Sequence, residues 1–268
     1  MINIDTHLDA LEAESVFIIR EAYNKIKPLA LLWSLGKDSG VLIWLVKKAF
    51  FGHVPFMCLH IDTGKKFPEM YKFREEYTSK WNLRLEVGFC PPLEEMDSSL
   101  PPAARSAARK TAGLKEKIKQ LELNGLISGI RRDEEATRAK ERVFSRRDIS
   151  GAWEHKNQYP EFWNHYNTEI KTGEHLRVHP LLNWTELDIW YYIKRESIPV
   201  VPLYFSINGK RYRSLGDKDI TNPIISEAAT IDNIISELIK TKISERSGRA
   251  MDHESEDVFE KLRKDGYL

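Results

Sequence analysis

The chain has 268 residues, of which 41% are hydrophobic, and its 41 Lys and Arg face 40 Asp and Glu, which leaves a formal charge of +1. This balance excludes a global electrostatic attraction to nucleic acid or to an anionic membrane, so any anion-binding site must be local. No apolar run approaches the ~18 residues that span a bilayer, and with only Cys58 and Cys90 a CxxC zinc site or a four-cysteine iron–sulfur cluster is excluded within one chain.

The first residues, 1–5, lack the basic and then apolar pattern of a secretion signal, so we expect a cytoplasmic protein. Residues 8–26 have the period of an amphipathic helix that ends before Pro28. Short apolar strands then alternate with helices: strands at 29–33, 55–61, 83–87 and 126–128, and helices at 40–51, 69–81 and 113–121. This alternation predicts an α/β fold, a parallel sheet with helices on both faces, which binds ligands beyond the carboxyl ends of its strands.

Gly88 is expected to end the third strand, before an irregular, exposed connection that runs through residue 102. A further strand is predicted at 177–179, and Thr185 and Thr230 are predicted to cap helices that end at residues 195 and 240. The sheet pattern fades past Pro199. We therefore predict a nucleotide-binding α/β domain over residues 1–200 and an extension over 201–268 that packs on the core or on a partner.

The sequence Ser34-Leu35-Gly36-Lys37-Asp38-Ser39 lies between the first strand and the next helix, where a loop and a helix N-terminus form an anion cradle. Gly36 lets the backbone approach a phosphate, and Lys37 offers a point charge. The hydroxyls of Ser34 and Ser39 can donate hydrogen bonds, and Asp38 can cap the helix. An ordinary capped turn is the alternative, but spacing and context favour phosphate binding.

A Walker A loop needs a glycine where Leu31 stands and Ser or Thr where Asp38 stands, so this loop is of another kind. It resembles the PP-loop of ATP pyrophosphatases, whose pattern is Ser-x-Gly-x-Asp-Ser. That resemblance implies attack on the α-phosphate of ATP and release of pyrophosphate.

Asp62 lies in the sequence His60-Ile61-Asp62-Thr63-Gly64 at the end of the second strand, which is the ligand edge of such a sheet. It can orient a Mg²⁺-bound group or a ribose hydroxyl, and a plain strand-ending turn explains it equally well. We expect His60 to be structural.

Arginines crowd residues 129–142, directly after the fourth strand. On a helix, Arg131, Glu135, Arg138 and Arg142 would share a face, and the like charges of Arg138 and Arg142 at i, i+4 would cost a few tenths of a kcal/mol without a compensating anion. A solvated, salt-bridged helix is the alternative. The position at the ligand edge favours an anion clamp, with Arg132 beside it.

These three segments resemble the small, catalytic subunit of sulfate adenylyltransferase (ATP sulfurylase subunit 2). The likeness extends to His179-Pro180-Leu181, Trp184-Thr185-Glu186, Pro202-Leu203-Tyr204 and residues 244–249. It implies nucleotide-binding roles for Ser34, Gly36, Lys37, Asp38, Ser39 and Asp62, and catalytic roles for Lys37, Arg131, Arg132, Arg138 and Arg142. Arg246 and Arg249 are weaker candidates for closing the site or meeting a partner.

The resemblance implies that sulfate attacks ATP, with Mg²⁺ carried by the phosphates and no general base, and that a GTP-hydrolysing large subunit drives the reaction. One rival is an ATP pyrophosphatase of DNA phosphorothioation, whose partner would be a cysteine desulfurase. Others are a thiol-dependent reductase of adenylyl sulfate or its 3′-phosphorylated form, and a non-catalytic nucleotide sensor. The family generally has cysteine where this chain has Asp217, and the connection from Pro91 to Arg109 also departs, which leaves the acceptor open.

Overall fold

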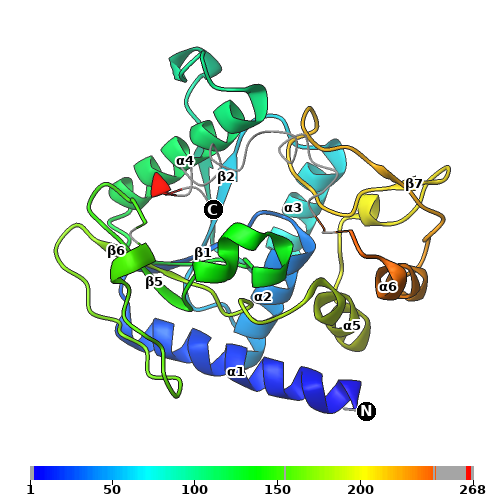
Figure 1. Cartoon of the computed structure of the whole chain (residues 1–268), viewed down its shortest axis with the longest axis horizontal. Coiled ribbons are helices and arrows are strands. Elements are labelled where there is room, and N and C mark those ends of the chain that lie inside the picture. The colour runs from blue at the N-terminus through cyan, green and yellow to red at the C-terminus, as the bar shows by residue number, and fades with distance from the viewer. Residues whose placement is uncertain (1–2, 154, 244, 246–263, 267–268) are drawn as a thin grey trace.

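The computed structural model describes residues 3–153, 155–243, 245 and 264–266 (Figure 1). Its main sheet has the order β3-β2-β1-β4-β6-β5, and a separate pair joins β7 to β8. The strands are β1 Leu29–Leu32, β2 Met57–Asp62, β3 Leu85–Phe89, β4 Gly125–Ile127, β5 Phe144–Arg147, β6 His175–Val178, β7 Lys210–Arg211 and β8 Ile224–Ile225. The helices are α1 Ile4–Lys25, α2 Lys37–Ala49, α3 Pro68–Lys80, α4 Pro102–Gln120, α5 Glu186–Glu196 and α6 Ile231–Lys240.

The centre of the sheet is β1, whose Leu31 is in register with Cys58 of β2 and Ile127 of β4, both in parallel. The chain builds β2 and β3 on one side of β1 and then crosses to the other side for β4 and β6. The direction of winding therefore reverses between β1 and β4. In an open α/β sheet this reversal leaves a crevice beyond the carboxyl ends of the strands, where ligands bind.

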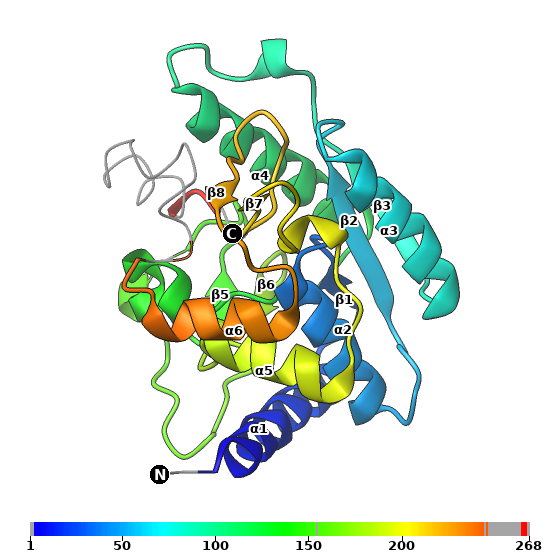
Figure 2. The same ribbon diagram turned by 90° about the vertical axis from the view of Figure 1, so that its right-hand side faces the viewer.

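Helices cover both faces of the sheet, as the alternation of strands and helices predicts. Leu29, Leu31 and Trp33 of the β1 segment pack with α1, α2, α3 and α5 in the larger core. Ala30 and the partly buried Leu32 face the opposite way and pack with residues of α4. Figure 2 shows α4 on one side of the sheet and α1 and α5 on the other, with α6 packed beside α5. None of the described helices is long and apolar enough to cross a membrane.

The sequence-based boundaries need three corrections. Gly88 does not end β3 but pairs with Ile61 inside it. A Cβ at this position would come within 2.6 Å of the Lys117 side chain on α4. The glycine thus lets α4 approach the sheet. The helix expected from residue 113 begins at Pro102. An unexpected strand, β5, pairs antiparallel with β6. It could not be recognised as an apolar run because two of its four residues are arginines.

Two predicted caps are confirmed. The Thr185 hydroxyl accepts from the amide of Asp188, whose carboxylate accepts from the Thr185 amide at 2.8 Å, and Thr230 caps α6 through the amide of Asn233. Tyr204 and Glu245, which follow residue 200, reach the ligand edge of the sheet. The domain boundary near residue 200 stays a prediction.

Candidate active site

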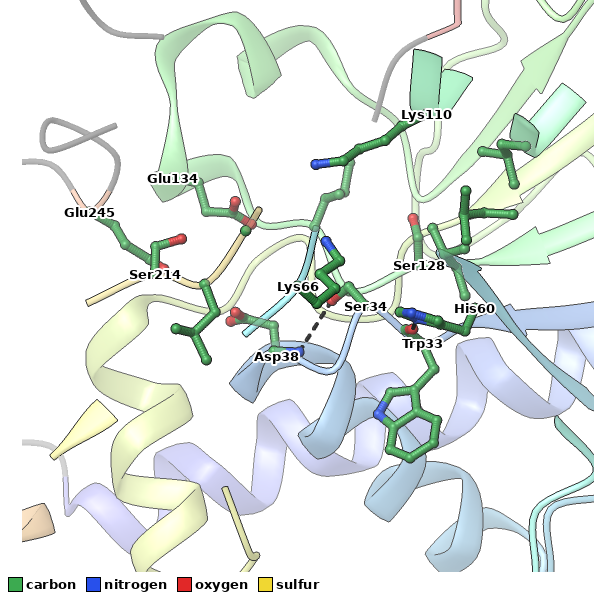
Figure 3. A pocket seen from close by; sticks show the side chains of 18 of the residues that line it. Trp33, Ser34, Asp38, His60, Lys66, Lys110, Ser128, Glu134, Ser214 and Glu245 are labelled. Carbon is green, nitrogen blue, oxygen red and sulfur yellow. Dashed lines mark hydrogen bonds between the residues drawn. The ribbon is translucent and has the colours of Figure 1, made fainter. Parts of the chain in front are cut away.

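A cavity of about 210 Å³ opens beyond the carboxyl ends of β1, β2 and β4, at the reversal between β1 and β4. Figure 3 places Lys110 above this cavity, Asp38 below it, and Glu134 and Glu245 on one side. The loop after β1 and the segment after β4 form its floor and one wall, while β2, α4 and the C-terminal part supply the rest. Its polar lining residues are Ser34, Asp38, His60, Lys66, Lys110, Thr111, Ser128, Glu134, Arg138, Tyr204, Ser214 and Glu245.

The predicted phosphate loop curls around the hydroxyl of Ser34. This hydroxyl lies 3.1 Å from the Ser39 hydroxyl and accepts from the Gly36 amide at 3.4 Å, and the Ser39 hydroxyl donates to the Gly36 carbonyl at 3.0 Å. Gly36 is the N-cap of α2 and receives no side-chain cap, so Asp38 does not cap this helix as expected. The loop therefore brings to the cavity the N-terminus of a helix whose N-cap residue supplies no side-chain acceptor, and such an N-terminus favours anions.

Lys37 and Ser39, two residues of the predicted phosphate loop, are buried. The Lys37 side chain is 1% exposed, and its ammonium pairs with Glu245, lies 3.5 Å from an Asp38 oxygen and lies 4.0 Å from a Glu186 oxygen. The backbone N–H of Lys37 donates to the Tyr204 hydroxyl at 3.0 Å. A charged residue at the start of a helix is buried here because carboxylates from distant segments surround it.

The arginine-rich segment is not the expected helix. It forms two short 3-10 turns, η2 Arg132–Glu134 and η3 Ala136–Lys140, and Glu135 between them is extended, with φ near −167°. Arg131, Arg138 and Arg142 therefore do not share a helical face. The physical reason is that a run this rich in charge has no apolar stripe to hold a helix on the core, while each buried arginine finds its own carboxylate.

Two of the four arginines, Arg131 and Arg138, lie near the reversal of the sheet between β1 and β4 and are buried in ion pairs. The buried Arg131 guanidinium pairs with Asp38, with Glu245 and, at 2.9 Å, with Asp133. The buried Arg138 lines the cavity and donates to Glu134 at 2.8 Å.

Of the four predicted arginines only Arg138 lines the cavity; Arg131, Arg132 and Arg142 do not, and neither do Lys37 and Ser39. Arg132 contacts Asn183 and donates to the backbone carbonyl of Glu141 at 3.1 Å. Arg142 offers its carbonyl to the His179 ring at 2.8 Å. Arg246 and Arg249 lie outside the described residues.

Carboxylates from several segments surround the cations near the loop. Burial would raise the pKa of Glu245, but Lys37 and Arg131 outweigh it and hold that pKa below its usual range. Burial and the neighbouring Glu245 raise the pKa of Glu186. Within the described part of the chain, the cations of this network are Lys37, Arg131, Arg138 and Arg213, and its carboxylates are Asp38, Asp133, Glu134, Glu135, Glu186 and Glu245. The described residues contain no group of three or more side chains that could hold a metal ion.

Asp62 and His60 stabilise the ends of the strands. The Asp62 carboxylate accepts from the Gly64 amide and the Tyr71 hydroxyl, both at 2.8 Å, and from Arg74 at 2.9 Å. These bonds shape the turn after β2, and Asp62 itself does not line the cavity. His60 does line it, and its Nδ1 donates to the Trp33 carbonyl at 2.8 Å. Burial lowers the pKa of His60 to about 4, so this ring is neutral.

A second charged cluster escaped the sequence analysis. Lys66, in the loop after β2, and Lys110, on α4, line the cavity, and both contact the carboxylate of Asp217. Lys66 lies two residues after the segment His60 to Gly64, and Lys110 lies between the expected connection and the helix expected from residue 113. Only the fold brings the three residues together.

Both thiols remain protonated. Burial raises the pKa of Cys58 to about 12. Burial also raises the pKa of Cys90. Neither thiol therefore has the depressed pKa of an activated nucleophile.

Comparison with known proteins places this geometry among its relatives. A family model described as "Phosphoadenosine phosphosulfate reductase domain" matches residues 28–223. Sulfate adenylyltransferase subunit 2 of Marinomonas sp. (strain MWYL1) is 44% identical, and that of Ectopseudomonas mendocina (strain ymp) is 42% identical, each over 98% of both chains.

Solved structures share the fold at lower identity. The FMN adenylyltransferase of Candida glabrata, in complex with FMN and the ATP analog AMPCPP, aligns with a TM-score of 0.57 at 19% identity, over 83% of this chain and 68% of that one. The phosphoadenylyl-sulfate reductase of Candida auris, a phosphate complex, aligns with a TM-score of 0.53 at 17% identity, over 81% of this chain and 97% of that one.

Proposed function

The chain belongs to the sulfate adenylyltransferase subunit 2 family, and on that premise we propose that it is a nucleotidyltransferase that cleaves ATP between the α and β phosphates and transfers the adenylyl group to sulfate. The observation that carries this proposal is the position of the cavity. It lies at the reversal of the sheet between β1 and β4, and the loop Ser34 to Ser39 forms part of its wall. In such a sheet the loop after the first strand and the N-terminus of the next helix hold phosphates.

Lys37 and Arg131 form the anion site of the loop. Both are buried, and both contact the carboxylate of Glu245. That carboxylate stands in for a phosphate oxygen in our proposal, since an anion in this position meets two cations at once. Bound ATP would take the place of Glu245, and the amides of the loop, Lys37 and Arg131 would stabilise the leaving pyrophosphate.

MgATP is the form that binds in this proposal. Carboxylates such as Asp38 and Glu134 line the cavity, and a divalent cation on the triphosphate offsets the repulsion between them and the phosphate oxygens. We assign Mg²⁺ to the substrate. Asp38, on the floor of the cavity, is the carboxylate best placed to meet it.

The acceptor needs no proton removed. Sulfate is fully ionised at neutral pH, so the reaction requires no general base. Among the described residues, the histidine that lines the cavity is His60, which is neutral. Catalysis then consists of holding the acceptor in line with the leaving pyrophosphate and of stabilising charge. Arg138, in the cavity wall, is the arginine that would meet the charge developing on the α-phosphate.

A large subunit that hydrolyses GTP is part of this proposal. Adenylyl sulfate is a high-energy product, so the forward reaction needs an energy source, and the relatives are themselves named as subunit 2 of their enzyme. The phosphate loop of this chain lacks the Walker A pattern, so the GTPase would be a separate chain.

The proposal is tested by measuring pyrophosphate release from ATP with and without sulfate. Inorganic pyrophosphatase in the assay converts the released pyrophosphate to phosphate, which is the species measured, and so drives the unfavourable reaction without a partner subunit. We expect release that saturates with sulfate and does not respond to chloride at matched ionic strength. Release independent of sulfate, or none with sulfate present, would contradict sulfate as the acceptor.

A further inference from the structure

One buried carboxylate holds two lysines at the wall of the cavity. The side chain of Asp217 is fully buried, and its two oxygens lie 2.9 Å from the ammonium groups of Lys66 and Lys110, one each. The hydroxyls of Thr63 and Ser106 donate to the same carboxylate at 2.7 and 3.0 Å. Four donors from two separate segments, the loop after β2 and α4, thus fix this group.

The adjacent pair of residues shows what an ordinary ion pair looks like in this region. Lys65 and Asp219 pair at 2.6 Å, but their side chains are 43% and 49% exposed. The corresponding exposures of Lys66 and Asp217 are 8% and 0%. An exposed pair contributes little to stability, whereas burying a carboxylate with two ammonium groups costs desolvation that a structural role alone does not require.

The charge of this cluster favours an oxyanion. The charges of these three residues, Lys66, Lys110 and Asp217, sum to one positive charge at the cavity wall. Burial would raise the pKa of Asp217, but Lys110 and Lys66 hold it well below its usual range, so the aspartate stays ionised. It therefore holds both lysines in place through its ion pairs with them.

The position of the cluster fits the attacking group rather than the leaving group. Lys110 comes from α4, which covers the opposite face of the sheet from α2, and it lies across the cavity from Asp38 in Figure 3. In-line displacement at the α-phosphorus needs the attacking oxygen roughly opposite the leaving pyrophosphate. If the loop after β1 holds the pyrophosphate, the wall opposite must hold the acceptor.

We infer that Lys66 and Lys110 bind the attacking sulfate dianion and that Asp217 is the positioning residue that holds the two lysines for it. This inference rests on the proposed function and assigns the acceptor subsite to residues outside the arginine-rich segment. In the reaction, a sulfate oxygen forms the new bond to the α-phosphorus, and the bond from that phosphorus to the bridging oxygen breaks as pyrophosphate leaves.

The test measures KM for sulfate at saturating ATP and KM for ATP at saturating sulfate, by pyrophosphate release. Lys66→Gln and Lys110→Gln should each raise KM for sulfate about 10- to 100-fold, the effect of losing one charge-assisted contact, and leave KM for ATP within about twofold. Lys66→Arg, which keeps the charge, should recover part of the loss. The matched controls, Lys65→Gln and Asp219→Asn, should change neither constant.

Asp217→Asn should raise KM for sulfate about 10-fold, because the lysines are no longer fixed. If it lowers only the melting temperature and the fraction of active enzyme, Asp217 has a structural role alone and its assignment is overturned. Lys110→Gln, whose parent side chain is 25% exposed, gives a second test should Asp217→Asn fail to fold. The subsite is overturned if the lysine variants raise KM for ATP and not for sulfate. A wild-type enzyme without sulfate-dependent turnover would instead overturn the proposed function, and this inference with it.

Discussion

Arg131, in the segment that follows β4, donates to the carboxylate of Asp38, in the first turn of α2. This ion pair joins the two elements on either side of the sheet's reversal, so the phosphate loop and the arginine-rich segment form one rigid wall. The buried Glu245 completes it by pairing with Arg131 and Lys37. Because this network of ion pairs is buried, substitutions in it should lower the folding free energy as well as the activity.

Arg138 and Arg142 should behave differently although both are arginines of the same segment. Arg138→Gln removes a buried cation from Glu134, and breaking such a pair costs about 3 kcal/mol of folding free energy. It should also lower kcat/KM roughly 30- to 1000-fold through the lost contact to the α-phosphate. Arg142→Gln, at a half-buried side chain that does not line the cavity, should change folding free energy by less than about 0.5 kcal/mol. Urea unfolding and steady-state kinetics of both variants measure these effects. Equal effects of the two substitutions would contradict a specific role of Arg138 in the cavity and would favour the alternative of a solvated, salt-bridged segment.

Lys37→Ala should reduce both stability and turnover. It leaves Glu245, Asp38 and Glu186 with one cation fewer in a buried site, which should cost roughly 3 kcal/mol and lower the melting temperature by about 10 °C. Lys47→Ala, in the last turn of the same helix, is the control and should melt near the wild type. A Lys37 variant with unchanged thermal stability would mean that the network around it is not formed in solution.

Gly36→Ala should weaken ATP binding without lowering the stability of the fold. The backbone of Gly36 has φ near −80°, and a Cβ there would meet the hydroxyls of Ser34 and Tyr204 at 3.4 Å, an ordinary contact. Stability should therefore stay close to that of the wild type, while the added methyl group between two cavity hydroxyls should weaken ATP binding about tenfold.

Gly40→Ala is the matched control, since nothing lies within 4 Å of a Cβ at that position inside α2. Alanine there should stabilise the helix by about 0.5 to 1 kcal/mol without changing ATP affinity. Calorimetric titration with ATP and thermal melts measure both effects. Equal ATP affinity in the two variants would remove Gly36 from the binding site.

Acid should destabilise the protein through buried neutral histidines. Burial lowers the pKa of His60 and His179 to about 4 and that of His175 to about 3, against 6.5 in the unfolded chain. Because the unfolded chain binds these protons first, their contribution is fully present above pH 6.5 and is lost as the pH falls toward 4. Burial raises the pKa of Glu161 and of Glu186, which act in the opposite direction, so a difference between variants is the cleaner measurement.

His60→Asn keeps a donor for the Trp33 carbonyl and removes the titration. Its unfolding free energy should fall less steeply between pH 6 and 4.5 than that of the wild type, by up to about 1.4 kcal/mol per pH unit. His53→Asn, at an exposed histidine, should follow the wild-type curve. Parallel curves for His60→Asn and the wild type would show that His60 is not buried as a neutral ring.

The fold class and the phosphate loop could be predicted from local sequence patterns. The strand, loop and helix around Ser34 to Ser39 could be predicted because the apolar run and the turn chemistry are contiguous in sequence, as is the cap at Thr185. The strand β5 was missed because only its pairing with β6 makes it a strand.

Long-range contacts decided the rest of the site. The burial of Arg131 depends on Asp38 and Glu245, which lie 93 and 114 residues away in sequence, and no spacing within the arginine-rich segment encodes them. The contact of Lys66 with Asp217 likewise spans 151 residues. Charge at a ligand edge could be predicted, but the carboxylate that would hold each cation could not.

The central claim, that ATP is cleaved between its α and β phosphates in this cavity, is tested most directly with ATP labelled separately at the α and γ positions. The chain is incubated with each labelled ATP and sulfate, and the products are separated. We predict that the γ label leaves as pyrophosphate and that the α label appears in adenylyl sulfate. Labelled ADP from the α position, with the γ label in inorganic phosphate, would contradict the account.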